Sequence, residues 1–172
     1  MSIYVVDVEA DGPCPGLFSM VQIGIVKVDD ALDTTFVRTL KPVTDQYDPG
    51  ALKAIGLTRD ETMTYEDPLQ VMKDLLTFIN ATNEGNAVFV SDNNGFDWQF
   101  VNYYCHRYLG ENPFGFSSRR IGDFYAGLKK DWRAASKWKH LKITKHTHDA
   151  LDDAKGNAEA MLAIAKMHNI KF

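Results

Sequence analysis

The sequence predicts an α/β fold built around a sheet of mixed direction. Three short runs rich in β-branched residues come first, and helical patterns then alternate with one further β run. This order of elements is typical of an α/β sheet with strands in both directions. The length of 172 residues indicates a single domain spanning 1–172, long enough to bury roughly two-thirds of the surface of the unfolded chain.

The first β run, residues 3–8, is apolar on both faces and rich in valine. A strand with this pattern lies in the centre of a sheet, covered on both sides. The loop 11–16 ends it, because this segment contains two glycines and two prolines. Further β runs follow at 21–28, 34–41 and 87–90.

Helix start signals mark the segments between and after these strands. Thr58 and Glu61 have the spacing of a capping box, and Pro68 stands where a proline begins a helix over 69–80. Apolar residues then recur at helical spacing in the last part of the chain. The remaining predicted helices cover 96–109 and 121–130, and one begins near Asp149.

The composition indicates a folded protein in a reducing compartment. Apolar residues make up 45% of the chain and charged residues 24%, which excludes a disordered chain or a fibrous repeat. Cys14 and Cys105 are too few for a disulfide framework. The first seven residues lack the basic start of a signal peptide, and the longest apolar run, 160–165, is too short for a membrane span. We therefore expect a cytoplasmic protein without a membrane partner.

Two carboxylates stand at the end of the first strand. Asp7 and Glu9 lie two residues apart and project from the same sheet face as Ile3 and Val5. Open α/β sheets bind their ligands at the carboxyl ends of their strands. Taken alone, the pair favours two solvated acids at a strand end, because a D-x-E pair is common by chance.

Two more acidic motifs stand at helix starts. Asp97 lies in the first turn after a strand and a loop, where it would also compensate the helix dipole. His148 directly precedes the last helix, and Asp153 lies in its first turns. Each motif alone also fits an ordinary cap or a surface residue.

The combination is more specific than its parts. D-x-E at 7–9, N-x-x-F-D at 93–97 and H-x-A-x-x-D-A at 148–154 occur in this order along the chain. Together they resemble the DEDDh family of 3′–5′ exonucleases, which includes polymerase proofreading domains, oligoribonucleases and tRNA-trimming enzymes. Residues 21–26 and 55–58 are also similar to family segments, so the resemblance spans nearly the whole chain. It implies a ribonuclease H-like fold, in which helices flank a central mixed five-stranded sheet.

The resemblance implies that Asp7, Glu9, Asp97, His148 and Asp153 are catalytic. Four converging carboxylates repel one another by roughly 4 kcal/mol per close pair at an effective dielectric near 20, so they must bind protons or cations. Hard oxygen ligands suit Mg²⁺ or Mn²⁺. By the resemblance, Asp7 bridges two such ions, Glu9 and Asp153 complete the first, and Asp97 holds the second. His148 would then deprotonate the attacking water.

The sequence departs from the family pattern in two places. The segment 10–13, Ala-Asp-Gly-Pro, replaces the small hydroxyl and glycine residues that usually follow the first two acids. Asp92 stands where relatives often have a histidine before Asn93. Neither departure alters the five expected catalytic residues, but the first affects the expected contacts to the 3′-terminal nucleotide.

Residues 129–148 carry seven lysines or arginines against one aspartate, a net charge of +6, whereas the rest of the chain is −10. Aromatic residues interleave with these charges, as in tracks for single-stranded nucleic acid, where lysines hold phosphates and rings stack on bases. A solubilising loop with buried tryptophans is the alternative. Met20 could contact terminal bases as a wedge, or pack in the core. The candidate nucleic-acid-binding residues are Met20, Asn93, Lys137, Trp138, Lys139, Lys142 and Lys145.

The sequence therefore predicts a metal-dependent 3′–5′ exonuclease that releases nucleoside 5′-monophosphates from single-stranded nucleic acid with a free 3′ end. DNA is favoured over RNA from the breadth of the family, since no residue discriminates the 2′-hydroxyl. The alternatives are a 3′–5′ exoribonuclease or RNA-trimming enzyme, an endonuclease on the same scaffold, and a non-catalytic nucleic-acid-binding module. With no polymerase or helicase segment of its own, the chain would act alone, as a homodimer or as a subunit of a larger assembly.

Overall fold

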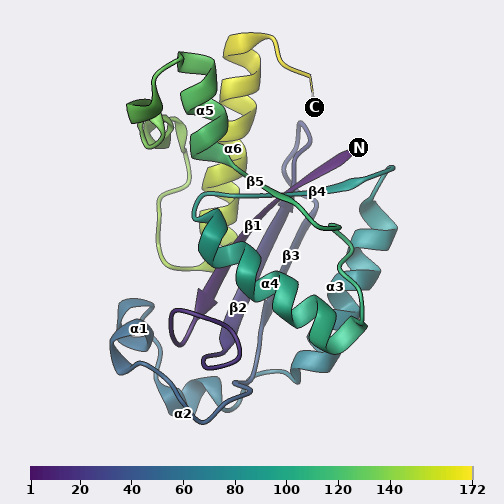
Figure 1. Cartoon of the computed structure of the whole chain (residues 1–172), viewed down its shortest axis with the longest axis vertical. Helices are drawn as coiled ribbons and strands as arrows, with labels where there is room; N and C mark the ends of the chain where they lie inside the picture. Colours follow the sequence, from purple (N-terminus) through teal and green to yellow (C-terminus); the bar gives the residue numbers. More distant parts are fainter. Residues whose placement is uncertain (172) are drawn as a thin grey trace.

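The computed structural model of the protein describes residues 1–171, which form a mixed sheet of five strands flanked by helices (Figure 1). The order of strands across the sheet is β3-β2-β1-β4-β5. β1, β2 and β3 are antiparallel neighbours, whereas β4 and β5 run parallel to β1. The predicted fold class is confirmed. The strands are β1 (Ser2–Ala10), β2 (Met20–Lys27), β3 (Thr35–Thr39), β4 (Ala87–Ser91) and β5 (Ser118–Arg120).

Helices cover both faces of this sheet. α3 and α4 pack on one face and α5 and α6 on the other, and side chains of β1 enter both cores (Figure 1). Tyr4 and Val6 point towards α3 and α4, and Ile3 and Val5 towards α5 and α6. The helices are α1 (Pro49–Ala54), α2 (Arg59–Thr62), α3 (Pro68–Thr82), α4 (Asn94–Leu109), α5 (Ile121–Lys129) and α6 (Ala150–His168), with 3₁₀ turns η1 (Trp132–Ala134) and η2 (Lys137–Leu141).

The helix start signals are confirmed. Thr58 and Glu61 form a reciprocal capping box at α2, and Pro68 occupies the first turn of α3. α6 begins directly after Asp149, whose carboxylate accepts hydrogen bonds from the backbone N–H groups of Leu151 and Asp152. Sequence reasoning had not placed α1 or β5, which are only six and three residues long.

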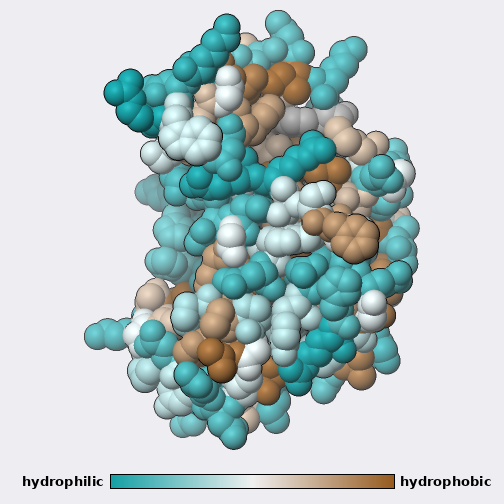
Figure 2. All heavy atoms as spheres, in the orientation of Figure 1, coloured by the Kyte–Doolittle hydropathy of each residue, from teal (hydrophilic) through white to brown (hydrophobic). Residues whose placement is uncertain are grey.

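The surface view in the same orientation shows mainly hydrophilic side chains, with hydrophobic ones scattered among them (Figure 2). Among residues 1–171, no helix combines the length and apolar character that crossing a bilayer requires.

Candidate active site

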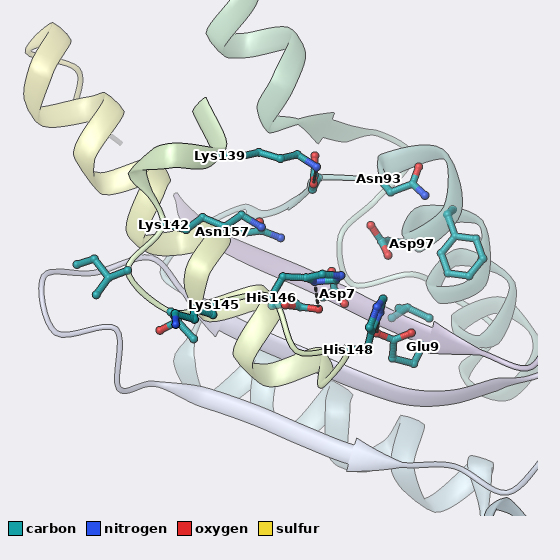
Figure 3. A pocket seen from close by; sticks show the side chains of 16 residues that line it. Asp7, Glu9, Asn93, Asp97, Lys139, Lys142, Lys145, His146, His148 and Asn157 are labelled. Atoms are coloured by element: carbon teal, nitrogen blue, oxygen red, sulfur yellow. Dashed lines mark ion pairs between the residues drawn. The ribbon is translucent and has the colours of Figure 1, made fainter. Parts of the chain in front are cut away.

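Carboxylates from three elements meet at the carboxyl end of β1. Asp7 and Glu9 come from β1, Asp97 from the first turn of α4, and Asp153 from the first turn of α6. All four line one pocket of about 540 Å³ (Figure 3). Oxygen atoms of Asp7, Glu9 and Asp153 lie within 4.8 Å of one another. The structure therefore gathers the four acids that are far apart in sequence.

Gly24 allows α6 to reach this position. It pairs with Asp7 across the β1–β2 ladder, and a Cβ atom on Gly24 would lie only 2.3 Å from the backbone carbonyl of Ala150. No side chain fits into such a gap, so the start of α6 lies directly against β2. Gln22 fixes it there, since its side chain donates to Asp149 at 3.0 Å and accepts from the Ala150 N–H at 3.3 Å. This docking brings Asp153 over β1.

α4 supplies Asp97 through the loop that follows β4. The backbone carbonyl of Asn93 accepts hydrogen bonds from the N–H groups of Phe96 and Asp97, which closes the first turn of the helix. Asn93 and Phe96 also line the pocket. Asp97 is only 2% exposed, and within residues 1–171 its Oδ2 atom has no hydrogen-bond partner. This buried oxygen is a free ligand atom beside the other carboxylates.

Burial and mutual repulsion raise the pKa values of carboxyl groups in the cluster, so these groups lose their protons less readily. Burial, with the nearby charges of Asp97, Glu9 and Asp153, raises the pKa of Asp7 well above its usual range. Burial and the charge of Asp153 raise the pKa of Glu9 to about 8, and burial raises the pKa of Asp97 to about 7. A bound cation removes this cost, because it favours the charged forms. The hard oxygen donors and the free Asp97 oxygen thus fit a divalent metal ion.

Two histidines border the pocket from the segment before α6. His148 is about half exposed, and its Nδ1 lies 4.0 Å from Oε1 of Glu9. His146 is also about half exposed, and its Nδ1 lies 2.6 Å from Oδ2 of Asp153. His148 therefore stands where the sequence placed a candidate base, beside the carboxylates and open to solvent. His146 was not among the predicted site residues, although its position two residues before His148 was a signal.

Three of the four predicted lysines reach the pocket. Lys139, Lys142 and Lys145 line it, and Figure 3 shows Lys139 and Lys142 on one side, opposite Asn93 and Asp97. Lys139 forms an ion pair of 2.7 Å with Asp92. Lys137 is not among the residues that line this pocket.

Lys137 is directed elsewhere, with its Nζ 3.9 Å from Asp131. Lys142 is half-buried, which lowers its pKa, although the negative charges of Asp92, Asp153 and Asp7 act in the opposite direction. Lys142 therefore places a half-buried cation close to the carboxylates.

The lysine-bearing segment 142–145 is anchored to α6 by Glu159. The Glu159 carboxylate accepts hydrogen bonds from the N–H groups of Ile143 at 2.9 Å and Thr144 at 2.7 Å, and from the Thr144 hydroxyl at 2.9 Å. Gly156 permits the close approach, because a Cβ there would lie 2.7 Å from the Thr144 carbonyl oxygen. This anchor holds the rim of the pocket in place. Sequence reasoning missed it.

The prediction that Trp138 stacks on bases is wrong. Its side chain is fully buried, its indole N–H donates to the Ala135 carbonyl at 3.0 Å, and it packs in the core with α6. The ring faces the cations of Lys142 and Lys139, whose Nζ atoms lie 5.2 and 6.0 Å from its centroid. The buried Trp138 ring therefore packs beneath Lys139 and Lys142 and helps to position their side chains. The alternative weighed from the sequence, a buried tryptophan, is correct for this residue but not for Trp132, which is 82% exposed.

Of the two roles that the sequence left open for Met20, the wedge against terminal bases is wrong and packing in the core is correct. Met20 begins β2 and is fully buried in the core between the sheet and α4. Its backbone N–H donates to the hydroxyl of Tyr104 at 3.0 Å. A buried side chain cannot contact a substrate, so Met20 has a packing role.

Asn157 is a pocket residue that sequence reasoning missed. It lies four residues after Asp153 in α6 and therefore on the same helix face. The residue is 1% exposed, and among residues 1–171 its Oδ1 atom has no hydrogen-bond partner. The i, i+4 spacing from Asp153 was the available signal. Figure 3 shows Asn157 beside Lys142 at the edge of the pocket.

Comparisons with known proteins agree with this geometry. A family model described as Exonuclease (RNase_T) matches residues 4–161. The chain is 36% identical over 174 residues to the 3′-5′ DNA exonuclease Cap18 of Escherichia coli. The alignment covers 96% of this chain and 92% of that relative.

Two solved structures show the same fold at lower identity. The nuclease domain of 3′hExo, a DEDDh family member bound to rAMP, matches with a TM-score of 0.78 at 18% identity, over 96% of this chain and 92% of that one. The zinc-bound complex of E. coli ExoI with single-stranded DNA matches with a TM-score of 0.74 at 20% identity. That match covers 97% of this chain and 40% of ExoI.

Proposed function

Because the chain belongs to the exonuclease (RNase T) family and is a 3′–5′ exonuclease, we propose that its carboxylate pocket removes nucleoside 5′-monophosphates from the 3′ end of single-stranded DNA. The observation that carries this proposal is the convergence of Asp7, Glu9, Asp97 and Asp153 from three elements on one pocket. The pocket also has a histidine at its mouth and lysines on its rim, which are the groups that phosphodiester hydrolysis needs.

The acids would hold two Mg²⁺ or Mn²⁺ ions. Asp7 would be a ligand of both ions, since the charges of the other three acids all act on it. Glu9 and Asp153 would complete the first ion, and Asp97 the second. Bound divalent ions supply a nucleophilic water at neutral pH and neutralise charge on the scissile phosphate. The raised pKa values of Asp7, Glu9 and Asp97 support this assignment, because the cluster gains most when cations replace its protons.

His148 would accept the proton of the attacking water. Its exposure to solvent and the 4.0 Å separation from Glu9 let the ring reach a water molecule beside the carboxylates. Histidine suits this task, since its ordinary pKa lies near neutrality. The backbone at His148 is held in the left-handed conformation, with φ of 60°. This fixes where the side chain leaves the loop.

The rim lysines would hold the phosphates of the strand. Lys139, Lys142 and Lys145 lie beside the carboxylates and form a positive border that the overall charge of −4 conceals. Asn93 lines the opposite side of the pocket and would contact the terminal nucleotide. Phosphate contacts of this type are independent of base sequence, so we expect hydrolysis of strands of any sequence.

The proposed preference for DNA rests on the relative that covers nearly the whole chain, a 3′-5′ DNA exonuclease. Hydrolysis of RNA is the alternative outcome. The test is digestion of the same strand as DNA and as RNA, single-stranded and duplex, labelled at the 5′ or the 3′ end, with Mg²⁺, Mn²⁺ or EDTA. We expect stepwise shortening of 5′-labelled single-stranded DNA, immediate release of the 3′ label as a mononucleotide, and no reaction in EDTA.

Variants of the acids test the site itself. Asp7→Asn and Asp153→Asn should reduce the rate by at least about a thousandfold, a loss of about 4 kcal/mol in transition-state stabilisation. Asp123→Asn is the matched control, because Asp123 is exposed on α5 and pairs with Arg120 outside the pocket. Full activity in pure Asp7→Asn protein would contradict the site, and faster digestion of RNA would contradict the preference for DNA.

A further inference from the structure

Two imidazoles and a buried carboxylate form a second group of potential ligands at the edge of the pocket. One ligand atom from each of His146, His148 and Asp153 lies within 4.8 Å of the others. The two imidazole rings are 4.2 Å apart between centroids and meet edge to face. Figure 3 shows both rings beside the carboxylates, on the segment that leads into α6. The mechanism above uses His148 and Asp153 but leaves His146 without a role.

The carboxylate in this group has one oxygen directly against the ring of His146. Oδ1 of Asp153 accepts a hydrogen bond from the Thr147 N–H at 3.2 Å. Oδ2 lies 2.6 Å from Nδ1 of His146 and, within the described chain, has no partner with hydrogen-bond geometry. Asp153 is 3% exposed. A buried carboxylate oxygen in contact with one imidazole, with a second imidazole within 4.8 Å, brings three ligand atoms to one place where they could hold a cation.

The chemistry of these donors differs from that of the acidic cluster. Asp7, Glu9 and Asp97 offer only carboxylate oxygens, which suit Mg²⁺ and Mn²⁺. Imidazole nitrogens suit Zn²⁺, Ni²⁺ and Cu²⁺, and three protein ligands plus water complete a tetrahedral zinc site. Ligand atoms of one tetrahedral zinc ion are roughly 3–4 Å apart, so small side-chain movements would suffice.

The local backbone keeps the two imidazoles together. Thr147 lies between them and is tied to α6 twice, by its N–H to Asp153 and by its hydroxyl to Asp152 at 3.1 Å. His148 has a positive φ of 60°, which turns the chain sharply before Asp149 caps the helix. Both histidines thus flank Thr147, whose position is fixed by these hydrogen bonds. Less conformational entropy is therefore lost when the two imidazoles are ordered around an ion.

From this geometry we propose that His146, His148 and Asp153 bind a transition-metal ion, with Zn²⁺ as the probe, and that the bound ion inhibits hydrolysis. Asp153 belongs to both ligand sets, so the transition metal withdraws it from the Mg²⁺ or Mn²⁺ cluster. The same ion would hold the imidazole of His148, which could then no longer accept a proton from the attacking water. The inhibition rests on the proposed function, whereas the binding does not.

The binding test measures Zn²⁺ affinity of the metal-free chain by calorimetry, in the presence of excess Mg²⁺. His146→Gln should weaken Zn²⁺ binding by about tenfold or more, since it removes a ligand, and should leave Mg²⁺ affinity unchanged. His140→Gln is the matched control, because His140 is exposed on the same segment and lies outside the pocket. This variant should bind Zn²⁺ like the parent.

A spectroscopic measurement on the parent protein needs no variant. Zinc should shift the ring-nitrogen resonances of His146 and His148 and leave those of His140 in place. In digestion assays with Mg²⁺, Zn²⁺ should inhibit the parent, and His146→Gln should need about tenfold more Zn²⁺ for half inhibition of its own uninhibited rate. Unshifted imidazole resonances, or equal losses of Zn²⁺ and Mg²⁺ affinity in His146→Gln, would overturn the proposal. If Zn²⁺ binds as described but neither parent nor variant digests DNA or RNA, the proposed function fails and the metal site stands.

Discussion

Raising the pH without metal should destabilise the folded protein. The carboxyl groups of Asp7, Glu9 and Asp97 hold protons in the folded state at pH values where the unfolded chain has lost them, because burial and mutual repulsion raise their pKa values. The folded state then binds more protons than the unfolded state, and its stability falls as the pH rises. The effect spans the window from the unfolded pKa of Glu9, 4.5, to its folded pKa of about 8.

Glu9 sets the scale of the loss. Each unit of pKa difference corresponds to about 1.4 kcal/mol, so a rise from pH 5 to pH 8 would cost at most about 4 kcal/mol through Glu9. The Glu9 side chain is 12% exposed, so solvent screens part of the electrostatic cost of ionising it. We therefore expect a loss on the order of 2–4 kcal/mol, or roughly 5–15 °C in Tm for a chain of this length.

Thermal unfolding in EDTA at a series of pH values measures this loss. Glu9→Gln cannot ionise and should flatten the decline, whereas Glu111→Gln, at an exposed position, should follow the parent. Adding Mg²⁺ or Mn²⁺ at pH 8 should restore stability, by about 2.7 kcal/mol at a hundredfold excess over Kd. A Tm in EDTA that stays level or rises from pH 5 to pH 8 would refute the reasoning.

Three further changes probe how the site is held. Gly24→Ala should cost about 1–3 kcal/mol and reduce activity, because its Cβ collides with the start of α6; Gly127→Ala, which meets no atom within 4 Å among the described residues, should not destabilise the protein in thermal unfolding. Glu159→Gln should raise KM more than it lowers kcat, since it loosens the rim segment without touching the acids. The double variant Lys139→Ala, Lys142→Ala should weaken binding of single-stranded DNA and reduce the slope of log affinity against log salt by about one to two; an unchanged slope would contradict their role as phosphate contacts.

The sequence predicted the fold class and the gathering of the acids because these features have local signatures. A strand of alternating faces places Asp7 and Glu9 on one side. A strand and a loop place Asp97 in the first turn of α4, and the cap Asp149 locates the start of the helix that bears Asp153. The order of motifs then identified the family. Gly24 has no such local signature, because its role depends on the contact between β2 and the start of α6.

Burial of single residues outside periodic segments was not predictable in the same way. Met20 directly precedes the predicted strand 21–28 and Trp138 stands in an irregular basic stretch, so no pattern of spacing shows which way either side chain points. β5 is three residues long and contains two arginines, and only its pairing with β4 makes it a strand. Glu159 acts through hydrogen bonds with Ile143 and Thr144, which a single sequence does not reveal, whereas the spacing of Asn157 from Asp153 was a signal that sequence reasoning missed.

Trp138 shows why the basic stretch cannot be understood from its charge alone. Lys139 and Lys142 at the pocket rim lie over its buried ring, so packing of an apolar side chain in the core positions these two charges. Trp138→Ala should cost about 3–5 kcal/mol, measured by denaturant unfolding, because it empties a core position. Trp132→Ala, at an exposed position of the same stretch, should leave stability within about 0.5 kcal/mol of the parent. Equal stability of the two variants would contradict this packing role. With the ring removed, the lysines should lose their fixed places beside the acids, so Trp138→Ala should also weaken DNA binding under conditions where it remains folded.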